Sequence, residues 1–190
     1  LHSRGQANSD PYDGLLSATP PGDEPPDRFV YDPADPVPTL GGNHSICWGD
    51  AFHVIQPGPF DQRSIEQRPD VVKYTTAPMA LDTEVTGPIV LHLHAATDAC
   101  DTDWTAKLVD VHPDGRAINL TEGNLRARFR KSIHAAPELL VPGQVYAYRV
   151  EIQPTSNVFL RGHRIRLEIS SSNFPLWDRN PKSGHKQGVY

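Results

Sequence analysis

Residues 104–120, WTAKLVDVHPDGRAINL, decide the fold class of this chain. Two runs rich in apolar and β-branched side chains flank a short polar stretch that ends in Asp114-Gly115. An Asp-Gly step is a strong hairpin signal because both residues tolerate positive φ. We therefore predict an antiparallel hairpin in which residues 104–112 pair with residues 116–120.

Two further segments show the alternation of a half-buried strand. Residues 164–171 (RIRLEISS) put branched aliphatic side chains on one face and charged side chains on the other. Residues 144–153 (QVYAYRVEIQ) alternate in the same way. Each segment is predicted to be a strand with one face in the core.

Short apolar runs separated by Gly, Pro, Asn or Asp continue through the rest of the chain from about residue 71. This pattern is typical of an antiparallel sandwich or barrel. Residues 123–140 also show helical spacing, so we expect a strand followed by a short helix there. The eight predicted strands are residues 71–76, 84–95, 104–112, 116–120, 124–131, 144–153, 157–160 and 164–171.

Composition narrows the class of protein further. With 19 prolines and 14 glycines among 190 residues, long helices have little room, which excludes an all-helical protein. The formal charge of −5 gives no attraction for nucleic acids or anionic membranes, so neither is expected as a partner. No apolar run is long enough to span a membrane. The compartment stays open, with a slight preference for the cytoplasm.

The amino-terminal third differs from the rest of the chain. Residues 1–70 carry 11 of the 19 prolines, most densely in residues 20–38 (PPGDEPPDRFVYDPADPVP), where a regular ladder would lose donors repeatedly. Phe29 and Tyr31 interrupt this polar run. We expect residues 1–70 to form an extended arm with loops, packed on a sandwich of residues 71–190, in one structural domain.

The motifs of a self-contained enzyme are missing from this sequence. No serine stands in the Gly-x-Ser-x-Gly setting of an α/β-hydrolase nucleophile, and residues 170–172 (SSS) are expected to satisfy backbone groups at a strand end. Neither Cys47 nor Cys100 has an activating neighbour. They allow one disulfide at most, and free thiols are the favoured alternative. We expect no catalysis by the chain alone.

Two groups of residues are candidates for a metal site. His92 and His94 lie on one face of a predicted strand, as a zinc pair would, but the polar face of a half-exposed strand explains them better. Asp98, Asp101 and Asp103 offer oxygen ligands for calcium, although a capped, solvated turn is favoured. We expect no metal or other cofactor.

Arginines and tryptophans suggest binding surfaces. Arg126, Arg128 and Arg130 are expected on the outward face of one strand, where they either pair with carboxylates or dock another domain. Trp48 and Trp104, with a third tryptophan at position 177, offer stacking surfaces for a sugar. A carbohydrate-binding jelly roll is therefore kept as the alternative function, and a metal-dependent enzyme is a more distant one.

Four long strings resemble a known family. They are DRFVYDPADPVPTLGG (27–42), GPFDQRSIEQRPDVVKYTTAPMALDTEVTGPI (58–89), DTDWTAKLVDVHPDGRAINLTEGNLRARFR (101–130) and PTSNVFLRGHRIRLEISSSNFPLWDRNPKSG (154–184). They are similar to the carboxy-terminal domain of the X-Pro dipeptidyl-peptidase and cocaine-esterase-like hydrolases, peptidase family S15. The resemblance implies a galactose-binding-like jelly-roll β-sandwich with little helix.

The same resemblance implies an indirect role in catalysis. Family members are serine hydrolases in which an α/β-hydrolase domain carries a Ser-Asp-His triad and the jelly roll packs against it, helping to wall the substrate pocket. None of the triad maps onto this chain. We therefore expect a non-catalytic domain whose partner is the α/β-hydrolase domain of the same parent, which would be a dipeptidyl-peptidase or an acyl esterase or amidase. The parent's substrate and its oligomeric state stay open.

Seven residues are predicted to serve this role. In the apolar loop of residues 43–60, Trp48 and Phe52 are expected to wall the substrate pocket, with packing over one end of the sandwich as the alternative. The expected interdomain surface consists of Phe29, Tyr31, Arg126, Arg128 and Arg130.

Overall fold

The structure, a computed structural model, describes residues 1–44 and 55–184. Its strands are β1 (Val72–Thr75), β2 (Thr83–Ala95), β3 (Asp103–Val111), β4 (Ala117–Arg126), β5 (Tyr146–Phe159) and β6 (Arg164–Ser170). Within the described residues, helical structure is confined to short 3-10 turns such as η2 (Gln62–Ser64) and η3 (Ala127–Phe129).

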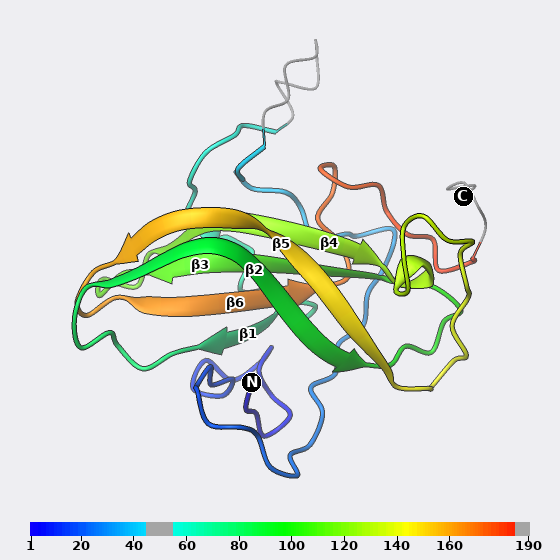
Figure 1. The fold of residues 1–190 in the computed structure, drawn as a ribbon, viewed down its shortest axis with the longest axis horizontal. Coiled ribbons are helices and arrows are strands. Elements are labelled where there is room, and N and C mark those ends of the chain that lie inside the picture. The colour runs from blue at the N-terminus through cyan, green and yellow to red at the C-terminus, as the bar shows by residue number, and fades with distance from the viewer. Residues whose placement is uncertain (45–54, 185–190) are drawn as a thin grey trace.

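The strands form two facing antiparallel sheets. One sheet has the order β1-β6-β3-β4, and the other is the pair β2-β5 (Figure 1). The chain passes between the sheets four times, at β1–β2, β2–β3, β4–β5 and β5–β6. The predicted all-β sandwich is confirmed. The division into an arm and a sandwich at residue 70 stays a prediction.

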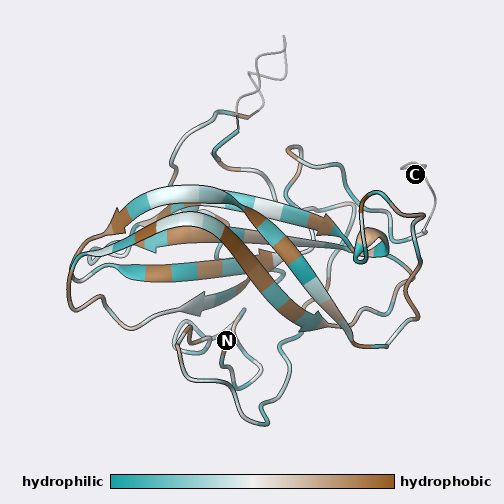
Figure 2. Ribbon diagram, viewed as in Figure 1, coloured by the Kyte–Doolittle hydropathy of each residue, from teal (hydrophilic) through white to brown (hydrophobic). Residues whose placement is uncertain are grey.

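The apolar core lies between the sheets. Tyr148, Val150 and Ile152 of β5 are buried, and their neighbours along the strand are exposed, as the alternation predicts. Bands of opposite hydropathy follow one another along β5 and β6 (Figure 2). From the other sheet, Trp104 and Leu167 pack into the same cluster.

Two predicted interruptions between strands are wrong, because the residues there continue a strand. Gly123 was expected to precede a new strand, but it lies inside β4, where a Cβ would come within 2.0 Å of Glu151 O on β5. Gly123 therefore lets the two sheets approach closely. Pro154 lies inside β5, opposite the irregularity between Gly87 and Ile89 of β2, where the ladder shifts register. The described residues 1–44 and 55–184 consequently form six strands where eight were expected.

The expected short helix after residue 131 is also wrong. β4 ends at Arg126, η3 supplies one 3-10 turn, and residues 131–145 follow as turns and irregular backbone. Pro137 and Pro142 interrupt backbone donors in this segment, which disfavours a regular helix.

The outer face of the four-stranded sheet carries a row of charges. The register pairs Lys73 of β1 with Glu168 of β6, Glu168 with Lys107 of β3, and Lys107 with Glu122 of β4. Directly opposed residues share a face, so basic and acidic side chains alternate across all four strands. Glu168, Lys107 and Glu122 are buried. We call these four residues the charged row.

Residues before β1 cover the charged row. Lys107 Nζ donates to Gln62 Oε1 at 3.3 Å, and Lys73 Nζ donates to Glu66 O at 2.6 Å. Arg166 of β6 pairs with the Glu66 carboxylate at 2.6 Å. These residues therefore bury much of the outer face of this sheet, which is lined by polar and ionisable side chains.

The amino-terminal residues follow the free edge of β1. The amide of Lys73 donates to Ala7 O (3.0 Å), and that of Thr75 donates to Gly14 O (2.9 Å). Gly14 has φ +73°, and a Cβ there would lie 1.9 Å from Lys73 O. Tyr74 Oη donates to Asp27 Oδ2 at 2.6 Å. These contacts hold residues 7–27 against the sandwich.

No helix among the described residues has the length and apolarity that crossing a membrane requires.

Candidate functional site

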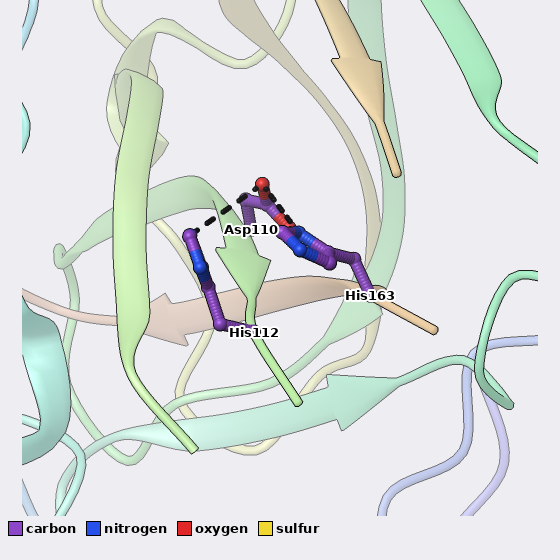
Figure 3. Close-up of side chains that lie close together, drawn as sticks. All are labelled: Asp110, His112 and His163. Carbon is purple, nitrogen blue, oxygen red and sulfur yellow. Dashed lines mark hydrogen bonds and ion pairs between the residues drawn. The ribbon is translucent and has the colours of Figure 1, made fainter. Parts of the chain in front are cut away.

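Two histidines and an aspartate meet where β3 ends and β6 begins. Asp110 is the second-last residue of β3, His112 follows this strand directly, and His163 immediately precedes β6. β3 and β6 are antiparallel, with Val111 opposite Arg164, so the end of one lies beside the start of the other. Figure 3 shows the three side chains turned toward one another.

The Asp110 carboxylate is the centre of this group. His163 Nδ1 lies 2.9 Å and 3.1 Å from its two oxygens, and His112 Nε2 lies 3.9 Å from Oδ2. The two imidazole rings are 4.3 Å apart and inclined by 40°. Asp110 and His163 are buried, whereas His112 is partly exposed. Arg116, which is ion-paired with Asp114, places Nη2 3.4 Å from His112 Nδ1.

Asp110, His112 and His163 were not predicted from the sequence to form a site. The histidine pair considered there, His92 and His94, is exposed on β2, which agrees with the favoured interpretation as the polar face of a strand. Asp110 and His112 are two residues apart in the predicted strand 104–112, so alternation places them on the same face and could have marked them as a candidate pair. Bringing His163 to them requires the pairing of β3 with β6, which no local pattern specifies.

The acidic loop of residues 101–103, whose last residue begins β3, is structural. Asp101 accepts from the Arg128 amide (3.0 Å) and pairs with its guanidinium (3.2 Å), and Asp103 pairs with Arg126 (2.9 Å). Asn180 Nδ2 donates to both carboxylates. Burial raises the pKa of Asp103, and Arg126 opposes that shift. The expected solvated turn is wrong for Asp101 and Asp103, because both are buried.

The expected outward stripe of arginines is also wrong. Only Arg126 belongs to β4, and its guanidinium pairs with Asp178 as well as with the acidic loop. Arg128 is buried in η3. Arg130 donates to Glu138 O (2.6 Å) and lies 4.5 Å above the Tyr146 ring. All three are engaged within the chain, so their assignment to an interdomain surface stays a prediction without support from exposure.

The two aromatic residues of the predicted interdomain surface are likewise engaged internally. Phe29 packs edge-on against Trp104, with ring centroids 6.4 Å apart. Tyr31 is buried, and Lys182 Nζ lies 5.4 Å from its ring. Val30, between them, is 84% exposed. Because Trp104 is a core residue, it cannot present the sugar-stacking surface considered for it.

The proposed pocket-wall residues Trp48 and Phe52 lie outside the described residues, and so does Cys47. Cys100 is a free thiol whose Sγ donates to Lys182 O at 3.3 Å.

The serines that end β6 satisfy backbone and hydroxyl partners, as predicted. Ser170 Oγ lies 2.6 Å from Thr105 Oγ1 and donates to Ser172 O. Ser172 Oγ accepts from the amide of Val37 at 2.9 Å. All three serines are buried.

One protein-family model matches nearly the whole chain. The family model of the X-Pro dipeptidyl-peptidase C-terminal non-catalytic domain matches residues 2–189. The chain belongs to this family. Membership agrees with the all-β sandwich described above.

Relatives of the chain are longer hydrolases. Over 184 residues it is 46% identical to the cocaine esterase of Rhodococcus sp. (strain MB1 Bresler), covering 97% of this chain and 31% of the esterase. An aminopeptidase from the marine sediment archaeon Thaumarchaeota archaeon has a similar structure, with a TM-score of 0.73 and 34% identity over 83% of this chain and 27% of that one. An α-amino acid ester hydrolase gives a TM-score of 0.71 and 31% identity, over 82% and 26%. The chain therefore spans about a third of the curated relative it matches.

Proposed function

We propose that this chain is the accessory β-sandwich domain of a larger serine hydrolase that cleaves esters or amides. In this proposal it stabilises an α/β-hydrolase domain and forms part of the wall of the substrate pocket. The observation that carries it is the 46% identity to a cocaine esterase over 97% of this chain but only 31% of the esterase. Ester cleavage is the favoured activity of the parent because an α-amino acid ester hydrolase is also among the similar structures.

One group of side chains has the composition of a catalytic triad. His2 Nδ1 lies 2.8 Å from Glu24 Oε1, and its Nε2 lies 3.1 Å from Ser17 Oγ. The same Nε2 is 2.9 Å from Thr19 O, a carbonyl that accepts its proton, so its lone pair does not face the serine. Ser17 Oγ in turn accepts from the Thr19 amide. We assign this group to loop stabilisation.

The first experiment measures hydrolysis of p-nitrophenyl acetate by the purified chain. The expected rate equals that of buffer and is the same for Ser17→Ala. Turnover well above buffer that disappears in Ser17→Ala would contradict the non-catalytic assignment.

The second experiment tests the pocket wall in the full-length parent. Trp48→Ala and Phe52→Ala are expected to lower kcat/KM by factors that differ among acyl and peptide substrates, with an unchanged melting temperature. Val30→Ala, which removes an exposed side chain, is the control. Uniform losses that follow a lowered melting temperature would mean that the two aromatic residues only pack against the sandwich.

A further inference from the structure

We propose that Asp110, His112 and His163 bind a divalent transition-metal ion, with zinc as the metal their chemistry fits best. Among the described residues, their potential ligand atoms all lie within 4.8 Å of one another. Two imidazoles and one carboxylate form a donor set that zinc prefers. This inference does not depend on the activity proposed for the parent.

The distances require only a small adjustment to close around an ion. Zinc bonds to nitrogen and oxygen of about 2.1 Å place tetrahedral ligand atoms about 3.4 Å apart. Here His163 Nδ1 lies 2.9 Å from the carboxylate, and His112 Nε2 lies 3.9 Å from it. One pair is slightly closer than required and the other slightly farther. A movement of the His112 ring by about 0.5 Å shortens the longer pair to the tetrahedral value, and small rotations of the Asp110 and His163 side chains lengthen the shorter pair by about the same amount.

The backbone is held at all three residues, so the adjustment is a rotation of side chains. The His112 amide donates to Arg116 O (2.8 Å) and its carbonyl accepts from the Gly115 amide (2.9 Å). Asp110 is held in the β3 ladder, and the His163 amide and carbonyl are hydrogen-bonded to Leu160 O (2.9 Å) and the Met79 amide (2.7 Å). His112 stands at the start of the exposed turn, with 24% of its side chain accessible. All three ligands thus stand on an ordered backbone, and His112 faces solvent, from which water can complete a four-coordinate shell.

Charges near the group set the expected response of metal affinity to mutation. Coordination through Nε2 leaves the His112 ring proton on Nδ1, which now faces Arg116 Nη2 at 3.4 Å. Metal binding must therefore break this contact, and the Arg116 charge opposes the incoming cation. Asp114 pairs with Arg116 and weakens that opposition. Arg116→Gln is accordingly expected to tighten metal binding.

The test is a titration of the chelator-treated chain with Zn²⁺ by calorimetry, together with the visible spectrum of its Co²⁺ form. We expect a site of one ion per chain whose affinity falls by about 100-fold in His112→Ala and rises several-fold in Arg116→Gln. His92→Ala and His94→Ala, on the exposed face of β2, are matched controls and should keep the site. A Co²⁺ spectrum of tetrahedral type should appear in the wild type and disappear in His112→Ala.

Two results would overturn the inference. One is the absence of a one-to-one Zn²⁺ site in the wild type. The other is a site that persists unchanged in His112→Ala and in His112→Gln, which preserves the side-chain size. Circular dichroism of each variant separates a loss of binding from a loss of the fold, and His112 is chosen because its side chain is partly exposed.

Discussion

Arg128 and Asp101 form an ion pair that solvent scarcely reaches. Arg128 Nε lies 3.2 Å from Asp101 Oδ2, and only 6% and 1% of the two side chains are exposed. The Arg128 amide donates to the other carboxylate oxygen. The pair therefore ties η3 to the loop that precedes β3, at the end of the sandwich.

Breaking this pair from one side should strongly destabilise the chain. Arg128→Met removes the guanidinium and leaves the buried Asp101 carboxylate without its ion-pair partner. This should lower the free energy of unfolding by about 3–5 kcal/mol. Urea denaturation measures the loss. Arg149→Met, which breaks an exposed pair with Glu151 on β5, should cost less than about 1 kcal/mol. Equal losses in the two variants would contradict the assignment of Arg128 as an anchor.

Glu168 should make stability depend on pH. Burial raises its pKa from 4.5 to about 8, although Lys107 opposes the shift. Between these values the folded chain holds a proton that the unfolded chain releases, so the free energy of unfolding falls as pH rises, by on the order of 1.4 kcal/mol per pH unit. Below about pH 4.5 this contribution is fully present.

Urea denaturation at several pH values between 5 and 8 tests this dependence. Glu168→Gln should flatten the decrease, whereas Glu151→Gln, at an exposed position of β5, should leave it unchanged. Parallel curves for the wild type and Glu168→Gln would show that Glu168 is not the source.

Gly123 should be intolerant of any side chain. A Cβ there would lie 2.0 Å from Glu151 O, so Gly123→Ala must push β4 away from β5, at a cost of about 1–3 kcal/mol or more. Gly22→Ala, where no atom lies within 4 Å of the added Cβ, is the control. An unchanged melting temperature in Gly123→Ala would mean that the sheets separate more easily than this contact indicates.

Tyr74 should hold the amino-terminal segment. Tyr74→Phe removes the 2.6 Å bond to Asp27 and leaves the carboxylate without that donor, which should cost about 1–3 kcal/mol. Cleavage by a nonspecific protease within residues 17–30 should become faster. Tyr12→Phe, at a side chain that is 93% exposed, is the control. Equal cleavage rates in both variants would contradict this role.

The fold class could be predicted because each strand carries its own local signal. The alternation in β5 and the Asp-Gly turn between β3 and β4 reflect short-range requirements on side-chain direction and φ. Strand ends were less predictable. Gly123 and Pro154 are breakers by local rules, and only contacts with the opposite sheet or strand explain why β4 and β5 continue through them.

The candidate site could not be predicted from local sequence patterns, because it is formed by residues far apart in the chain. Asp110 and His163 are 53 residues apart, and the pairing of β3 with β6 unites them. The arginine stripe failed for a related reason. Alternation along a predicted strand assigns Arg126 and Arg128 to a face, but it does not predict that the buried carboxylates of Asp101 and Asp103 pair with them.

Residues 7–16 also protect the chain against aggregation. An uncovered β1 would offer unpaired amides and carbonyls to any other strand, and such open edges promote association between molecules. The amides of Lys73 and Thr75 are instead taken by Ala7 and Gly14, whose missing side chain lets the cover lie flat on the strand. A shortened protein that starts at β1 is therefore expected to aggregate. Residues from His2 onward should be kept, because the His2 amide donates to Leu15 O and fixes the segment that covers β1.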